Sequence, residues 1–172
     1  MTREELEHII RASADIYPLQ APDLADKIDS AIGEGSEFHR TYGYYAQGVG
    51  PETATLPDDW MDRVHRVQNG NTSGRVGYCL DLVDLFLSKA VAGREKDREF
   101  CMALMERRYI VPDQALELVP RMPIDDKARR SLRATIRRWA KTVHEVGAAS
   151  IRSAATNSRN PSPRAAGSTR RP

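Results

Sequence analysis

The sequence predicts an α+β fold, with a small mixed sheet in the first half of the chain and helices in the second. Short segments with extended or helical character, separated by glycine and proline, follow one another as far as about residue 80. From Asp81 onward, apolar residues recur at the three- and four-residue spacing of helices. The chain has 172 residues, 40% of them hydrophobic, which is enough to bury one ordinary core. We therefore expect a single folded domain.

Most elements of the first half carry a start or stop signal of their own. Thr2-Arg3-Glu4-Glu5 fits a capping box at the start of a helix, and Pro18 ends the short strand that follows it. Pro22 suits the first turn of a second helix and Gly33 suits its end. The elements expected here are a helix at 2–14, a strand at 15–18, a helix at 22–32, a strand at about 44–49 and a hairpin at 64–80 with its loop at 69–74.

Helical segments fill the second half, and glycine or proline separates them. The segments are expected at 82–92, 97–108, 113–120 and 125–145, with breaks at Gly93, Pro112, Pro120 and Pro123. Asp81 is a natural N-cap for the first of them. The last one is a basic amphipathic helix. Its cations form either a surface for tRNA or DNA or a solvated face over a buried apolar stripe.

Residues 147–172 have a different composition from the rest of the chain. They hold five arginines and no acidic residue, and Ser, Ala, Gly and Pro dominate. Removing those five arginines from the 26 basic residues leaves 21 against 24 acidic ones, a net charge near −3. We expect a disordered basic tail after a folded domain at 1–146, of which 125–146 is the basic helix. The tail can hold phosphates weakly or serve only as a solvated terminus.

Cysteine usage and hydropathy indicate a cytoplasmic protein that does not bind membranes. Cys79 and Cys101 lie among apolar residues and form no CxxC pair, so we expect buried, reduced thiols. The N-terminus is charged and has no signal-peptide pattern. No apolar stretch approaches the length needed to cross a bilayer.

Lys89 stands out in the first helix of the second half, because its neighbours on the same face are apolar. At 100° per residue it lies within about 20° of Leu82 and 40° of Leu85. An ammonium in this position must reach solvent, find an anion or lose its proton. The alternatives are a lysine that extends to solvent at the helix edge and a lysine that faces a partner or ligand.

A polar cluster follows directly. Gly93 should end the helix and leave Arg94-Glu95-Lys96 in a tight connection, with Asp97 as the cap of the next helix. A short helix–helix connection reverses the chain and brings Lys89, Arg94, Lys96 and Asp97 close together. Three cations around one acid suit a phosphate chain. The simpler alternative is a salt bridge between Arg94 and Asp97 that fixes the corner, with Lys96 in water.

The segment "DLFLSKAVAGREKDREF" resembles the C-terminal motif of a bacterial nucleotidyltransferase-fold family related to the AbiEii abortive-infection toxins. The segments "ADIYPLQAP", "AIGEGSEFHRTYGYYAQGVGPETATLP" and "RVQNGNTSGRVGYCLDLVDL" are similar to further blocks of that family, so the resemblance covers roughly residues 14–120. It implies a strand leading into a Gly-Ser turn that holds nucleotide phosphates, and a neighbouring strand with two carboxylates that share Mg²⁺. A lysine of the later helix would hold the nucleotide's negative charge.

This chain departs from that plan at two places. No Gly-Ser pair precedes Asp15, which matches the second carboxylate, and the position two residues before it is Ser13. One carboxylate holds Mg²⁺ only weakly. The sequence thus resembles a truncated nucleotidyltransferase fold, as if an internal segment had been removed.

The resemblance implies that the chain would transfer a nucleoside monophosphate from a Mg-nucleoside triphosphate to an RNA or protein acceptor, with activity weakened or lost. Asp15 and Lys89 are the candidate catalytic residues, and Asp15 is also the candidate ligand for the Mg²⁺ cofactor. The candidate nucleotide-binding residues are Lys89, Arg94, Lys96 and Asp97. A missing strand and helix would expose sheet surface and favour self-association or the binding of an antitoxin. The alternative is a non-catalytic module that binds nucleic acid or protein.

Overall fold

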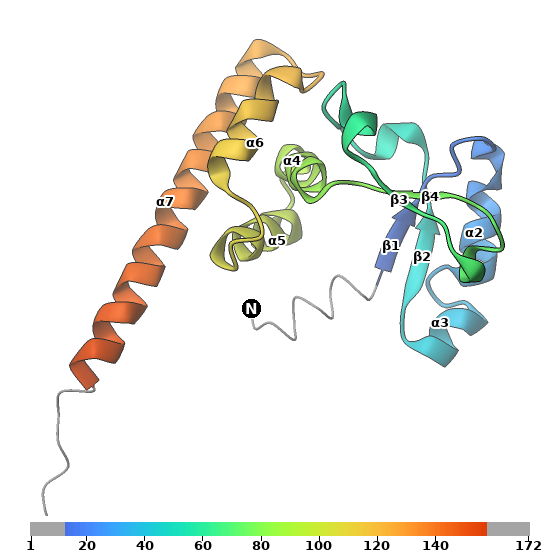
Figure 1. Ribbon diagram of the computed structural model, residues 1–172, viewed down its shortest axis with the longest axis horizontal. Helices are drawn as coiled ribbons and strands as arrows, with labels where there is room; N and C mark the ends of the chain where they lie inside the picture. Colours follow the sequence, from blue (N-terminus) through green and yellow to red (C-terminus); the bar gives the residue numbers. More distant parts are fainter. Residues whose placement is uncertain (1–12, 158–172) are drawn as a thin grey trace, which may run out of the picture.

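A computed structural model describes residues 13–157 of the chain (Figure 1). The elements are, in order, β1 (Ser13–Ile16), η1 (Pro22–Leu24), α2 (Ala25–Ile32), α3 (Glu37–Tyr42), β2 (Tyr45–Gly48), η2 (Pro51–Thr53), η3 (Trp60–Arg63), β3 (His65–Val67), η4 (Gly70–Thr72), β4 (Gly77–Cys79), α4 (Leu82–Ala92), α5 (Glu95–Glu106), α6 (Pro112–Leu118), η5 (Val119–Arg121) and α7 (Asp126–Asn157). The helix predicted at 2–14 falls almost wholly outside the described residues, and so does the tail after residue 157.

The α+β class is confirmed, and the strands form two separate two-stranded sheets among the described residues. β1 and β2 pair in parallel, with Ser13 opposite Tyr45 and Ile16 opposite Gly48. β3 and β4 form the predicted antiparallel hairpin, in which Arg66 lies opposite Tyr78. Figure 1 shows the strands with α2 and α3 at one end of the molecule, and α4 to α7 at the other.

The parallel pair is covered by α2, and one glycine sets how closely the helix approaches. A Cβ placed on Gly48 would lie 2.0 Å from the carbonyl oxygen of Ala25, a backbone atom that cannot easily move away. The Gly48 amide also donates a hydrogen bond of 2.9 Å to the Asp29 carboxylate of α2. Glycine is therefore required where the strand and the helix meet.

The main core lies in the helical half. Its buried residues come from α4 to α7 and the segments between them: Val83, Phe86, Leu87, Ala90, Cys101, Leu104, Met105, Ile110, Ala115, Val119, Met122, Leu132, Ile136 and Trp139. The rings of Phe86 and Trp139 meet edge to face, with their centroids 6.4 Å apart. The region that the sequence marked as most regular is thus the region that buries the most apolar surface.

Some helices begin and end where the sequence predicted, and others do not. α4 has the predicted bounds, because the Asp81 carboxylate accepts a 2.9 Å hydrogen bond from the Val83 amide and Gly93 ends the helix at φ +67°. α5 starts two residues earlier than predicted, at Glu95, so Asp97 lies in its first turn and is not its cap. α3 was not predicted; Ser36 caps it. α7 continues to Asn157, past the end predicted for the basic helix.

Two further expectations concern exposure. Cys101 is buried as predicted, but Cys79 is exposed, as are the other residues of β3 and β4. Within residues 13–157, no helix combines the length and the apolar character that crossing a bilayer requires.

Candidate functional site

The corner between α4 and α5 brings the main predicted site residues together. Gly93 adopts the left-handed conformation that ends α4, and Arg94 is extended at the start of α5. The two helices therefore meet at a tight reversal. Lys89 in the last turn of α4 lies beside Asp97 in the first turn of α5.

Asp97 is the centre of this cluster. Its carboxylate accepts hydrogen bonds of 2.6 Å from Nε and 3.2 Å from Nη2 of Arg94. The Nζ atom of Lys89 lies 3.9 Å from Oδ1 of the same carboxylate. The Asp97 side chain is only 3% exposed, against 27% for Lys89 and 58% for Arg94. A buried carboxylate thus holds two cations that both reach the surface.

A residue of β1 interacts electrostatically with this cluster. The pKa of the Arg94 guanidinium is raised, first because Asp97 accepts its hydrogen bonds and then through the charge of that carboxylate. The charge of Asp15, an exposed residue of β1, adds to this rise. Asp15 therefore lies within electrostatic range of Arg94, although the two residues are far apart in the sequence.

Lys96 does not join the cluster. It is exposed, and in the described part of the chain it makes no ion pair. The salt bridge between Arg94 and Asp97 that the simpler alternative expected is present, with Lys89 as an additional member. The structure thus brings Lys89, Arg94 and Asp97 together and leaves Lys96 in solvent.

Among the described residues, Asp15 is not part of a side-chain cluster that could hold a metal ion. The described residues contain no group of three or more His, Cys, Asp or Glu side chains that could hold a metal ion. Mg²⁺ requires several hard oxygen ligands to replace its water. One exposed carboxylate is a weak ligand, so residues 13–157 by themselves do not fit a protein-bound Mg²⁺.

A second charge cluster was missed in the sequence. The Asp84 side chain is 0% exposed and accepts hydrogen bonds of 2.9 Å and 2.7 Å from Nε and Nη2 of Arg63. Arg63 also lies 2.9 Å from Asp59, which in turn pairs with Arg121. These four residues tie η3 to α4 and η5, so their role is to fix the irregular segment before the hairpin against the helical core.

The signal for this cluster was available in part. Asp84 stands between Val83 and Leu85 in a mostly apolar helix, so, like Lys89, it is a charged residue among apolar neighbours. A charge there needs a partner. The partner could not be identified, since Arg63 lies 21 residues away in a segment without periodicity.

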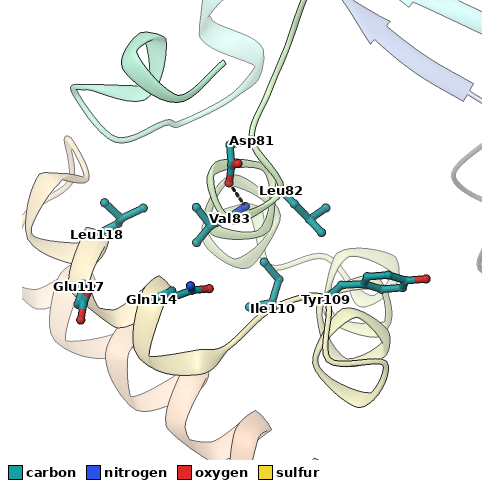
Figure 2. Close-up of a pocket in the computed structure, with 8 residues that line it drawn as sticks. All are labelled: Asp81, Leu82, Val83, Tyr109, Ile110, Gln114, Glu117 and Leu118. Carbon is teal, nitrogen blue, oxygen red and sulfur yellow. Dashed lines mark hydrogen bonds between the residues drawn. The ribbon is translucent and has the colours of Figure 1, made fainter. Parts of the chain in front are cut away.

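A surface hollow of about 410 Å³ lies at the other end of α4 (Figure 2). Asp81, Leu82 and Val83 line it from α4, and α6 and the loop before it line the other side. Figure 2 shows the Tyr109 ring at one edge and the Gln114 side chain between the two helices. None of the predicted site residues borders this hollow, so it is separate from the Lys89 cluster.

An aromatic group covers one side of α3 and the start of β2. The ring of Phe38 lies 4.8 Å from that of Tyr42 and 5.1 Å from that of Tyr44, between centroids. The rings pack against each other, and both tyrosines stay exposed. The group is therefore a local cluster that remains open to solvent.

Comparison with known proteins identifies the family to which the chain belongs. The model of a family described as "Nucleotidyltransferase of unknown function (DUF6036)" matches residues 6–127, well over half of the chain. No curated protein and no solved structure matched. The matched segment contains β1 with Asp15 and the whole α4–α5 corner, whereas nearly all of α7 lies beyond it. The relation to AbiEii toxins and the missing Gly-Ser segment remain predictions. The chain belongs to the DUF6036 family of nucleotidyltransferases of unknown function.

Proposed function

We propose that this chain binds a nucleoside triphosphate at the α4–α5 corner and that its transfer of the nucleoside monophosphate is weak or absent. The observation that carries the proposal is the convergence of Lys89 and Arg94 on the buried Asp97 carboxylate. Family membership supports the nucleotide as the ligand, because the matched segment includes this corner.

The two cations keep donors for a ligand. Arg94 uses Nε and Nη2 for Asp97, and a guanidinium has five N–H groups in all, so three stay available. The Lys89 ammonium has only the 3.9 Å contact, longer than a good hydrogen bond. Asp97 acts as a positioning residue, since it holds both cations in one place without filling their hydrogen-bonding capacity. Phosphate oxygens can take the remaining N–H groups.

Nucleotidyl transfer requires more than nucleotide binding. In-line transfer needs the developing charge on the phosphoryl group to be neutralised, which this type of enzyme does with metal held by paired carboxylates. Asp15 has Ser13 at the position where a second carboxylate would stand, so we assign no step to protein-bound metal. Any Mg²⁺ would arrive with the nucleotide, as part of the substrate. The proposed acceptor is RNA or a protein.

Thermal stabilisation by nucleotide tests the binding part. The melting temperature should rise with Mg-nucleoside triphosphate in the wild type, because a ligand that binds only the folded state stabilises it. Lys89→Ala should lose most of this rise, whereas Lys27→Ala, which removes the same charge from an exposed site on α2, should keep it. Equal rises in both variants would show that the corner is not the nucleotide site.

Label transfer tests the catalytic part. Purified protein is incubated with Mg²⁺, labelled nucleoside triphosphates and either RNA or protein acceptor. We expect transfer close to that of the Lys89→Ala variant. A wild-type signal well above that variant would show that the chain is an active transferase, and the weakened-enzyme proposal would be wrong.

The second candidate function is binding without catalysis. The observation in its favour is the strongly basic α7, which carries Lys127, Arg130 and Arg137 on its exposed side. Salt-dependent retention on nucleic acid without any nucleotide-induced stabilisation would favour this candidate over the first.

A further inference from the structure

Positive charge is concentrated at the C-terminal end of this protein. Of the 26 basic and 24 acidic residues, 126–172 hold 12 basic and 2 acidic, and 1–125 hold 14 basic and 22 acidic. The net charge is therefore +10 for the C-terminal part and −8 for the rest. Such asymmetry within one chain is typical of proteins that contact polyanions.

The cations of α7 form a stripe on its solvent side. This α7 basic stripe consists of Lys127, Arg130, Arg133, Arg137, Arg138 and Lys141, all exposed except the half-buried Arg133. At 100° per residue its members fall within an arc of about 140°. Leu132, Ile136 and Trp139, on the opposite side, are buried in the core. The helix is thus anchored by one face, and between residues 127 and 141 the other face presents only cations and small residues.

Within residues 13–157, few ion pairs neutralise this charge. Between residues that the structure describes, the ion pairs on α7 are Arg129 with Asp126 at 2.9 Å and Lys141 with Glu145 at 3.8 Å. Neighbours along the stripe stand three or four residues apart, where like charges repel and destabilise a helix. A face that served solubility alone would mix both signs. The stripe therefore has an electrostatic cost that a bound polyanion would relieve.

The position of α7 leaves the stripe accessible. Figure 1 shows α7 along one flank of the molecule, with α5 and α6 on its inner side. Nearly all of α7 lies outside the segment matched by the family. Its sequence is thus largely separate from the matched segment that contains the α4–α5 corner.

We propose that the α7 basic stripe binds double-stranded DNA, with α7 seated at the major groove and the cations on the phosphates. A helix with its side chains is about 10–12 Å across, which the B-form major groove of about 12 Å admits. The stripe is about 21 Å long, from 14 steps of 1.5 Å, and so stays within one turn of the duplex.

Other polyanions fit this face less well. The deep, narrow major groove of an RNA duplex excludes a helix. Single strands are held by stacking on aromatic rings, and the only aromatic residue between 127 and 141 is Trp139, which is buried. A helix that lies on a membrane inserts its apolar face, but that face of α7 packs in the core.

The salt dependence of DNA binding tests the proposal quantitatively. The full chain is titrated onto a labelled DNA duplex of about 30 base pairs, by fluorescence anisotropy, from 50 to 200 mM salt. Six phosphate contacts predict a slope of log affinity against log salt of about −5.4, a loss of roughly 2,000-fold over this range. A variant with Arg130→Ala, Arg137→Ala and Arg138→Ala should make the slope less negative by about 2.7, because three contacts are lost.

A charge-matched variant is the control. Lys27→Ala, Arg66→Ala and Arg75→Ala remove the same charge from exposed positions in the first half of the chain, and the slope should not change. Because the tail arginines are present in every protein tested, the difference in slope reports on the stripe alone. Lys89→Ala should also bind DNA normally, which separates this proposal from the nucleotide site.

Three results would overturn the proposal. The first is an equal slope for the wild type and the stripe variant, with circular dichroism showing that α7 is intact. The second is an equal effect of the charge-matched control. The third is tighter binding to an RNA duplex, a single strand or anionic lipid vesicles than to the DNA duplex at the same salt concentration.

Discussion

Replacing Asp84 with alanine should destabilise the protein strongly, because it removes the main partner of a guanidinium inside the fold. Asp84 has no exposed side-chain surface and accepts two hydrogen bonds from Arg63. Breaking one partner of a buried ion pair costs about 3–5 kcal/mol. Arg63 is 22% exposed and keeps Asp59 at 2.9 Å, so we expect the lower end, about 3 kcal/mol.

Urea unfolding followed by circular dichroism measures this change as a free energy of unfolding. For a chain of this length, about 3 kcal/mol corresponds to a fall in melting temperature of about 6–12 °C. The matched control is Asp62→Ala, which removes an exposed carboxylate of η3 next to Arg63 and should stay within about 0.5 kcal/mol of the wild type.

A double-mutant cycle separates the ion pair from other effects. If the cost of Asp84→Ala comes from an unpaired Arg63, then Arg63→Ala combined with Asp84→Ala should cost clearly less than the sum of the single changes. A cost below about 1 kcal/mol for Asp84→Ala, or strict additivity of the two changes, would refute the assignment of this pair as a structural tie.

Three further predictions follow from other parts of the structure. Arg63 and then Arg121 lower the pKa of Asp59 below its ordinary 3.8, so ionised Asp59 stabilises the fold fully above that pH and loses its effect as the pH falls through the lowered pKa. The stability curves of wild type and Asp59→Asn should differ at neutral pH and converge in acid. Burial raises the pKa of the Cys101 thiol to about 12, whereas Cys79 is exposed. A thiol reagent at pH 8 should therefore modify Cys79 in the folded protein and spare Cys101. Equal labelling of the two cysteines would contradict the burial of Cys101. Gly48→Ala should cost about 1–3 kcal/mol in urea unfolding, because its Cβ would meet a backbone oxygen of α2, and a neutral result would show that the strand and the helix can separate freely.

Local sequence signals located the helical half and the corner of the candidate site. Asp81 and Gly93 define α4 because a cap and a left-handed terminus depend only on the residues beside them. Arg94 and Asp97 pair because residues three apart share a face at a helix start. Lys96, one residue from Asp97, points about 100° away around the same helix and so misses the cluster.

Long-range pairings were beyond the reach of the sequence. The sequence of a strand does not show which other strand it pairs with. The four strands could therefore have been expected in one sheet, whereas the structure has two: the parallel β1–β2 pair and the β3–β4 hairpin. Arg63 finds Asp84 only through the fold of an irregular segment. The exposure of Cys79 has the same origin, since its apolar neighbours in the sequence suggested burial, whereas the described residues leave both strands of the hairpin exposed.

The energetics of α7 explain how a helix can carry so many like charges. Repulsion between neighbours three or four residues apart opposes the helix by about 0.2–0.5 kcal/mol for each pair, and the α7 basic stripe contains several such pairs. Burial of a large apolar side chain contributes about 1.5–3 kcal/mol, and Leu132, Ile136 and Trp139 all lie in the core. Packing of one face therefore outweighs repulsion on the other, so the stripe can stay charged while the protein is free. Its cations are then held on a rigid element before any polyanion arrives, which reduces the entropy lost on binding.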